Sequence, residues 1–308
     1  MKTSIPYLTK SRYIKSLRCE KKLWLGLHRR LPYEEALLFS VLETGNRMRK
    51  TAVVSLALGL LFLAGCATPQ HQLPDIQDNR VYAAAAEIAA TPEPTAREVS
   101  DHEAVARISA LYNQLKPAAT EVCRYVGEHH CHWELTYSPE EEINAYASDA
   151  ATVVIYKGIV QYARSDAEIA MVIAHEMAHH IADHIRESQN SQAIGAIIGG
   201  VAMTLLLGDA AAYSGQVIAD GMQIGAAAGA LTFSRKQEME ADYLSAYIIS
   251  RAGFDLDAGR GILVKLGRLG GRTTSTVLDT HPAGPERLAA WDLATAEIRS
   301  GSPMPRKS

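Results

Sequence analysis

His175-Glu176-Met177-Ala178-His179 places two histidines four residues apart, with an acid directly after the first. On a helix, residues four apart share one face, so both imidazoles can bind a single metal ion, for which zinc is the usual choice. Glu176 then lies beside the ion, where its carboxylate can take a proton from a bound water. The spacing therefore predicts a hydrolytic zinc site.

A helix must position these groups, and the sequence marks where it begins. Ser165 and Glu168 predict an N-cap with a capping box, and mostly apolar residues follow from Ile169 to Ala182. A helix this apolar is buried, and burying histidine and glutamate without a partner costs free energy. A bound metal removes that cost. The simpler alternative is a helix whose polar residues face water.

Two further histidines follow on the same predicted helix. At 100° per residue, His180 and His184 lie roughly 140° and 180° around the helix from His175. We therefore expect both to point away from the metal, as surface or outer-layer histidines.

A third protein ligand is expected from a second helix, whose N-cap we place at Ser234. Glu238 and Asp242 are four residues apart on that helix and share a face. One can bind zinc while the other hydrogen-bonds a ligand histidine. Glu240 lies about 200° from Glu238, so we expect it to face elsewhere.

Together these motifs resemble those of gluzincin metallopeptidases of the HtpX and CAAX-prenyl-protease family. The resemblance covers roughly residues 100–295. It rests on the histidine motif, the Ser234–Asp242 block, His281-Pro282 followed by Arg287, and the stretches 143–147 and 153–158.

The resemblance implies a fold and a ligand set. The fold is α+β and mainly helical, a zincin-like metallopeptidase domain with a small β-sheet beside the catalytic helix. Glu238 becomes the third ligand of one Zn²⁺ per chain, and Asp242 its partner in the outer layer. An edge strand near residues 143–158 would align an extended peptide substrate by strand addition.

His281 is the expected second catalytic residue beside Glu176. It follows a Gly/Thr/Ser stretch that could form a loop over the site, so it could donate to the oxyanion of the reaction. It could equally occupy the open zinc position as an inhibitory ligand, or belong to a structural His-Pro turn. We expect Arg287 to anchor the last helix.

Residues 48–65 have the pattern of a lipoprotein signal peptide. Positive Met48-Arg49-Lys50 precedes the apolar run 51–62, and Leu63-Ala64-Gly65-Cys66 resembles the bacterial lipobox. We expect diacylation of Cys66, which anchors a protein stably. The alternative is a retained transmembrane anchor. An aspartate directly after the lipidated cysteine resembles an inner-membrane retention signal. Here Ala67 and Thr68 follow Cys66, so we expect attachment to the outer membrane, facing the periplasm.

Residues 1–47 do not fit this plan. The stretches 7–14 and 19–25 resemble the opening of RecB-like exonucleases of the CRISPR-associated type, but no nuclease active-site residues follow before Met48. We interpret these residues as a fusion remnant or a mis-assigned start, with Met48 as the functional start.

Charge excludes one class of partner. The first 65 residues carry 12 basic and 4 acidic side chains, which leaves 19 basic and 30 acidic in the remainder. A net charge near −11 argues against nucleic-acid binding. In an oxidising periplasm, Cys123 and Cys131 are spaced for a local disulfide. The alternative is a second metal site at Cys131 with the histidines at 129, 130 and 132.

The remaining chain divides by composition. Residues 66–95, with four prolines, predict a tether; residues 96–300 the metallopeptidase domain; and residues 301–308 a tail. One or two amphipathic helices are expected over 99–108 and 111–122, and strands near 132–137 and 151–156. The weakly polar segments 193–208 and 222–233 fall short of about twenty residues, so we expect buried or membrane-facing helices rather than a membrane-embedded hairpin.

The sequence thus predicts a lipid-anchored periplasmic zinc endopeptidase acting on misfolded or damaged envelope proteins. The competing prediction is a non-proteolytic envelope chaperone or assembly factor with a structural zinc site. An intact Glu176 favours the enzyme, because structural zinc needs no general base.

Overall fold

The computed structural model describes residues 69–127, 131–148, 151–207, 215–216, 218–220, 222–223, 233–269 and 281–301. The chain forms two compact units. The main unit comprises Ala67–Glu187 and Thr232–Ser308, and the second unit comprises Met1–Cys66 and Ser188–Leu231. The signal peptide, Cys66, the nuclease-like stretch and the loop before His281 lie outside the described residues.

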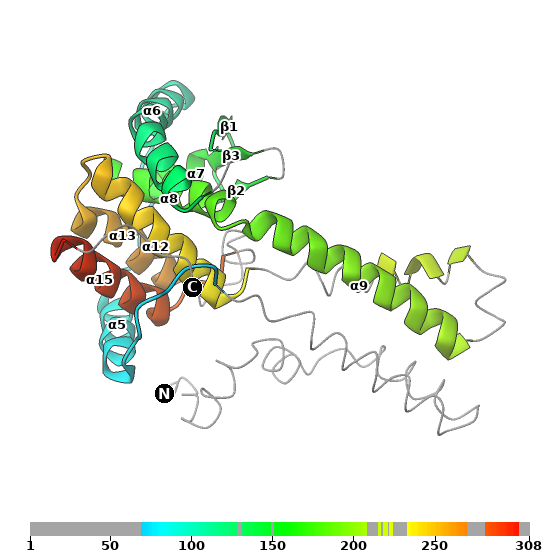
Figure 1. Ribbon diagram of the computed structural model, residues 1–308. Helices are drawn as coiled ribbons and strands as arrows, with labels where there is room; N and C mark the ends of the chain where they lie inside the picture. Colours follow the sequence, from blue (N-terminus) through cyan, green and yellow to red (C-terminus); the bar gives the residue numbers. More distant parts are fainter. Residues whose placement is uncertain are drawn as a thin grey trace, which may run out of the picture. The chain divides into compact units, whose positions relative to one another are not determined.

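The described elements are mainly helical with a small sheet, as the sequence predicts (Figure 1). In chain order they are α5 Asp78–Ala90, α6 Asp101–Tyr125, β1 Glu134–Ser138, β2 Ala145–Ala147, β3 Thr152–Tyr156, α7 Lys157–Tyr162, α8 Asp166–Ile181, α9 His184–Leu207, α12 Arg235–Arg251, α13 Leu256–Leu269 and α15 Pro285–Arg299.

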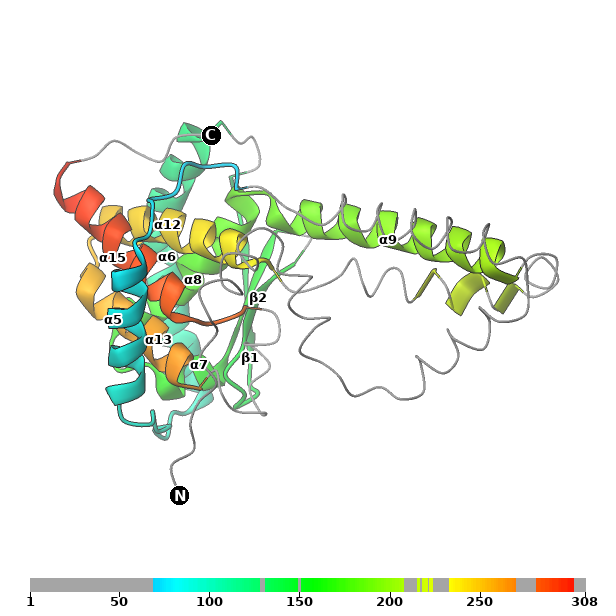
Figure 2. The same cartoon turned by 90° about the horizontal axis from the view of Figure 1, so that it is seen from below.

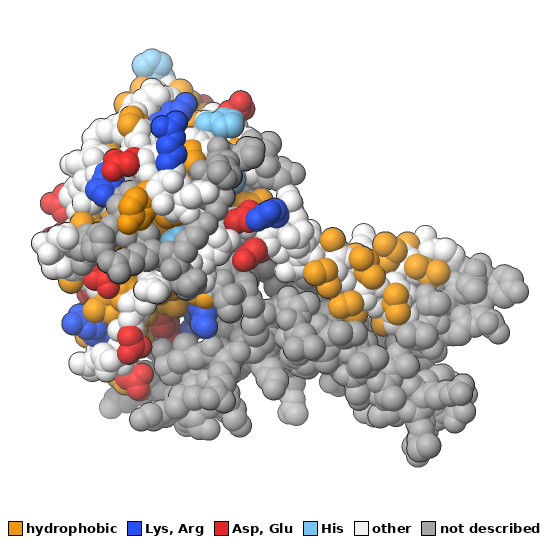
Figure 3. Space-filling model, in the orientation of Figure 1, with side chains coloured by type: hydrophobic (Ala, Val, Ile, Leu, Met, Phe, Trp, Pro, Cys, Tyr) orange, Lys and Arg blue, Asp and Glu red, His pale blue; other side chains and the backbone are white. Residues whose placement is uncertain are grey.

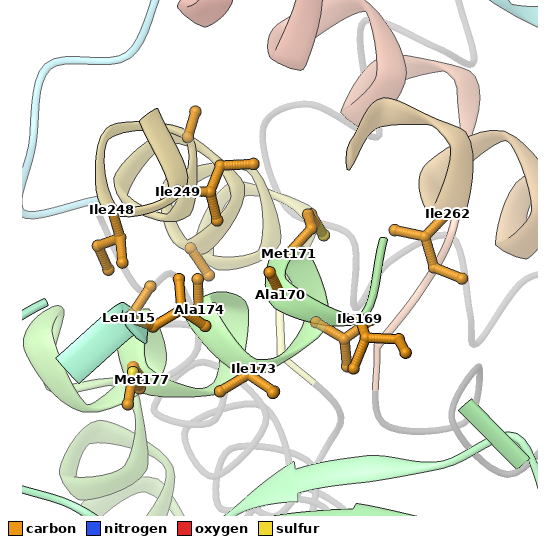
Figure 4. Packing of buried hydrophobic residues seen from close by; sticks show 14 of the residues in the cluster. Leu115, Ile169, Ala170, Met171, Ile173, Ala174, Met177, Ile248, Ile249 and Ile262 are labelled. Carbon is orange, nitrogen blue, oxygen red and sulfur yellow. The ribbon is translucent and has the colours of Figure 1, made fainter. Parts of the chain in front are cut away.

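Helix α8 is the centre of the main unit. Fourteen of its sixteen residues are buried, and it packs against α6, α12, α13 and the sheet (Figures 1 and 2). Figure 4 shows its apolar side chains meeting Leu115 of α6, Ile248 of α12 and Ile262 of α13. Burial on all sides means that each polar side chain of α8 needs a partner inside the protein.

Both helices expected to carry metal ligands begin where the sequence predicts. The hydroxyl of Ser165 accepts from the backbone N–H of Glu168, and Ser234 forms a full capping box with Gln237. In a capping box, the Glu168 carboxylate would accept from the backbone N–H of Ser165. It accepts instead from the backbone N–H of Arg164, one residue earlier, at 2.7 Å. The Glu168 carboxylate also accepts from Lys265, which ties α8 to α13.

The sheet has the strand order β1-β3-β2. β1 runs parallel to β3, and β2 runs antiparallel to β3 with Tyr146 opposite Val154. The strands fall close to the predicted ranges, and β2 packs on α8. Because β2 lies at an edge, its outer side has no strand partner among the described residues. The expected edge strand therefore lies beside the helix that carries His175.

The predicted tether is wrong for part of its length. Helix α5 occupies residues 78–90 and packs on α13 and α15, with Ala84 and Ile88 buried. Prolines 74, 92 and 94 flank this helix rather than interrupt it, and the alanine-rich run between them has high helix propensity. Proline content alone therefore overstated how extended this segment is.

Helix α9 contains most of the weakly polar segment 193–208. Ile194, Ile197 and Val201 are exposed, and Figure 3 shows apolar side chains along this helix. Among the described residues, no helix combines the length and apolarity required to span a membrane.

Cys123 and Cys131 are joined by a disulfide, with Sγ–Sγ 1.97 Å. This bond links the end of α6 to the segment that leads into β1. A bonded Cys131 offers no thiolate to the alternative metal site, whose histidines at 129 and 130 lie outside the described residues.

Candidate metal centre

Four buried side chains converge between α8, α12 and the segment before α15: His175, His179, Glu238 and His281. One nitrogen or oxygen of each lies within 4.8 Å of the others. The Nε2 atoms of His175 and His179 are 3.1 Å apart, and they lie 3.4 and 3.5 Å from the carboxylate oxygens of Glu238. A tetrahedral zinc ion separates its ligand atoms by about 3.3 Å. These three residues therefore fit zinc.

The outer nitrogen of His175 is held by a carboxylate. Nδ1 lies 2.9 Å from Oδ1 of Asp242, one helical turn after Glu238 on α12. Arg287, near the start of α15, donates from Nε and Nη2 to both oxygens of Asp242 at 2.7 and 2.8 Å. Its Nη1 lies 2.6 Å from Oε2 of Glu238. Arg287 thus anchors the last helix, as expected, and does so on the two acids of the site.

Charge keeps most of the groups in the form that binds a cation. Burial would raise the pKa of Glu238, but Arg287 and His281 hold it well below its usual range. Burial lowers the pKa of His179 well below 6.5, so its ring is neutral. Burial also opposes a charge on His175, yet Asp242 and then Glu238 raise its pKa to about 9. Binding of a cation would release that proton.

Glu176 and His281 lie on the same side of the cluster. Nε2 of His281 is 3.7 Å from Oε1 of Glu176, and its Nδ1 is 3.0 Å from Oε1 of Glu238. Both side chains are almost completely buried, and Oε2 of Glu176 has no hydrogen-bond partner among the described residues. A buried carboxylate oxygen without a partner is costly unless it receives a ligand. His281 is therefore part of the buried cluster.

The prediction for His184 is wrong in one respect: His184 is an outer-layer histidine, as expected, but it faces His179 instead of pointing away. It is 1% exposed, and its Nδ1 lies 3.0 Å from Nδ1 of His179. Helix α8 ends at Ile181, and Asp183 has φ 61°, a left-handed conformation that aspartate tolerates. The chain therefore turns before α9 begins, and the angular estimate, which assumed one continuous helix, does not apply to His184. His180 does point away, toward the carbonyl of Ser148 at 2.6 Å.

Two other residues of the site carried no sequence signal that we used. Phe233 stacks on the ring of His179, with centroids 3.9 Å apart. Glu240 faces away from Glu238, as expected, but is fully buried and accepts from His184. Its neighbours in Gln237-Glu238-Met239-Glu240-Ala241-Asp242 are mostly polar, so no local pattern marked Glu240 as buried, and its burial follows from the tertiary fold.

Comparison with known proteins gives a family match and several relatives. The sequence model of Peptidase family M48 matches residues 109–294. Mitochondrial metalloendopeptidase OMA1 of Arabidopsis thaliana is 33% identical over 155 residues, covering 50% of this chain and 30% of that protein. The Beta-barrel assembly-enhancing protease of Escherichia coli K12 is 31% identical over 154 residues, covering 48% and 31%. The chain thus spans about a third of the length of these relatives.

These matches refine the expected resemblance. The relatives are OMA1 and β-barrel assembly-enhancing proteases rather than HtpX or CAAX prenyl proteases, so the finer assignment is corrected to the broader peptidase family. The matched range contains the histidine motif, Glu238, His281 and Arg287. The nuclease resemblance of residues 1–47 gains no support from them.

Proposed function

Because the chain belongs to peptidase family M48, we propose that it is a zinc-dependent endopeptidase whose ion is held by His175, His179 and Glu238. The observation that carries the proposal is the convergence of these ligand atoms beside Glu176, a buried carboxylate with one oxygen unpaired. A structural zinc site closes its fourth position with a protein ligand and needs no such base, whereas a catalytic one keeps a position open.

A zinc ion held there would lower the pKa of water and polarise the carbonyl of the peptide bond. The Glu176 carboxylate accepts the proton of the attacking water and later delivers it to the leaving amine. Arg287 and Asp242 keep α12 and α15 in register with α8, so that Glu238 and His175 face each other across the site.

His281 is the proposed donor to the oxyanion. Its Nδ1 is engaged by Glu238, which leaves Nε2 on the side of Glu176 as the atom that can face the substrate. The same position allows Nε2 to occupy the open place on the ion as an inhibitory ligand. The two roles predict opposite effects of removing the ring.

The edge strand β2 is the proposed docking site for the substrate backbone. It packs on α8, and the bond from His180 to the carbonyl of Ser148 ties the end of β2 to the helix one residue beyond the ligand His179. An extended peptide added to β2 gains main-chain hydrogen bonds without a requirement for particular side chains. Such binding suits misfolded proteins as substrates.

Replacing Glu176 by Gln tests the proposal. The variant keeps the shape of the side chain but cannot accept a proton, so hydrolysis of an unfolded protein should fall by about 10²–10⁴-fold. Zinc content, measured by elemental analysis, should equal that of the wild type. Unchanged hydrolysis would refute the mechanism. Full zinc loading with no hydrolysis by either protein, together with suppression of aggregation, would indicate the chaperone instead.

The proposed location is the periplasmic face of the outer membrane, with a lipid on Cys66. Support comes from the lipobox pattern, the acidic remainder of the chain and the similarity to a protease named for β-barrel assembly. Labelling with a fatty-acid analogue should mark the wild-type protein and not Cys66→Ala, and only the wild type should fractionate with membranes. Equal labelling of both would exclude this anchor.

A further inference from the structure

The ligand His179 is supported through its outer nitrogen by a chain of three buried side chains. Nδ1 of His179 lies 3.0 Å from Nδ1 of His184, whose Nε2 lies 3.1 Å from Oε2 of Glu240. The other oxygen of Glu240 accepts from the ring Nδ1 and the backbone N–H of His71, at 2.6 and 2.7 Å. All four side chains are 1% exposed or less.

This chain has a single consistent placement of hydrogens once His179 gives its Nε2 lone pair to an ion. Its Nδ1 then carries the hydrogen and donates to Nδ1 of His184. His184 carries its own hydrogen on Nε2 and donates it to Glu240, and both N–H groups of His71 donate to the same carboxylate. In the direction from His71 toward the ion, each hydrogen bond fixes the tautomer and the ring orientation of the next histidine, and the last bond fixes those of His179.

The last member comes from a distant part of the sequence. His71 lies 169 residues before Glu240, and its neighbour Gln70 donates from Nε2 to the carbonyl of Ala182 at 3.0 Å. In Figures 1 and 2 the segment before α5 runs to the region where α9 and α12 begin. Residues 70–71 therefore contact Ala182, in the turn between α8 and His184, and Glu240 of α12.

We propose that His184, Glu240 and His71 are positioning residues that fix the orientation of the ligand His179 and so set the affinity of the site for zinc. The inference rests on the proposed zinc site and extends it to residues 70–71. Without His184, Nδ1 of His179 would lose this partner, and without both His184 and His71, Glu240 would be a buried charge that has lost these donors.

Zinc affinity of the purified full chain, measured by competition with a chromophoric chelator, tests the proposal. His184→Leu and Glu240→Leu should each raise the zinc Kd by about 10–100-fold, the range for losing a group that orients a metal ligand. His71→Leu, one step further from the ion, should raise it less. His184→Asn keeps a side-chain oxygen close to the position of Nδ1, so its Kd should stay within about threefold of the wild type.

A second readout separates positioning from general stability. The absorption spectrum of the cobalt(II) form reports the geometry of the ligands, and His184→Leu should alter it while His184→Asn should not. Ile169→Ala, at the other end of α8 from His179, is the matched control. It should lower the melting temperature of the zinc-free protein without changing the Kd or the spectrum.

Three outcomes would overturn the inference. A zinc Kd within about twofold of the wild type in both leucine variants would show that the chain does not act on the ligand. An equal rise in Ile169→Ala would assign the effect to stability. Absence of zinc binding by the wild type would overturn this inference and the proposed function together, whereas unaffected variants of a zinc-binding, peptide-cleaving wild type would overturn this inference alone.

Discussion

At the scale of residues, the two histidine ligands are supported in chemically different ways. Asp242 faces His175 as an ionised carboxylate whose pKa, which burial would raise, is held down by Arg287. His179 instead faces a ring nitrogen of another histidine, which accepts from it in the proposed arrangement of hydrogens. A carboxylate increases the basicity of an imidazole ligand more than a neutral acceptor does. His175 is therefore the stronger donor of the pair, and His179 depends more on being correctly oriented.

A substitution of His281 distinguishes its two proposed roles, oxyanion donor and inhibitory ligand. If Nε2 donates to the oxyanion, His281→Ala should lower kcat by about 10²–10³-fold with little change in KM, because the lost interaction forms in the transition state. Steady-state hydrolysis of a quenched fluorescent peptide measures both constants. His281→Asn retains an N–H donor and should recover part of kcat. The exposed His102, changed to Ala, is the control.

The opposite result has a clear meaning. A rise in activity of His281→Ala, accompanied by weaker zinc binding, would show that His281 is an inhibitory ligand and not a donor to the reaction.

The sequence predicted the residues of this site that belong to local patterns and missed those that do not. His175, Glu176 and His179 are related by one helical turn, and Glu238 and Asp242 by another, so a local pattern was enough. His184 required knowledge that α8 stops at Ile181 and that Asp183 turns the chain. His71 could not be predicted, because only the tertiary fold brings it to Glu240.

At the scale of elements, the same contrast holds. Helices α8 and α12 were predictable because Ser165 and Ser234 mark their starts. Helix α5 was not, because its stability depends on the packing of the whole helix against α13 and α15 as well as on local propensity.

The start of α7 depends on a glycine. A Cβ on Gly158 would lie 2.1 Å from the carbonyl oxygen of Glu142, in the loop that leads to β2. Backbone cannot yield as a flexible side chain does, so Gly158→Ala should displace this loop and cost about 2–3 kcal/mol of folding free energy. Thermal melting of the zinc-free protein should show the loss, and peptide KM should rise if β2 binds substrate.

A matched substitution is available at Gly215, where an added Cβ meets no described atom within 4 Å. Gly215→Ala should leave both melting and KM unchanged. A stable Gly158→Ala protein with normal KM would show that the loop before β2 has room to move.

At the scale of the whole main unit, its first described segment contacts two separate regions. Residues 70–71 bind the end of α8 and Glu240 of α12, while α5 packs on α13 and α15. Arg260 of α13 links these three helices, because it donates to Glu87 of α5 and to Asp292 of α15. A segment predicted to be a tether therefore joins four helices of the unit, and its attachment should respond to conditions that weaken these contacts.

Acid should weaken the attachment of α5. Hydrogen bonds from Arg260 lower the pKa of Glu87 below its ordinary 4.5, outweighing burial. A carboxyl group whose pKa is lowered by folding stabilises the fold above its unfolded pKa and loses that contribution as pH falls through the folded value. The melting temperature of Glu87→Gln should therefore lie below that of the wild type near pH 7, and the difference should shrink as the pH falls below the ordinary pKa of glutamate, 4.5. Because Glu87 is partly exposed, about 1 M salt should also shrink this difference in melting temperature.

Glu98→Gln, at an exposed position, controls for loss of a surface charge. A difference that persists unchanged in acid would mean that shape, and not charge, makes Glu87 hold α5 in place.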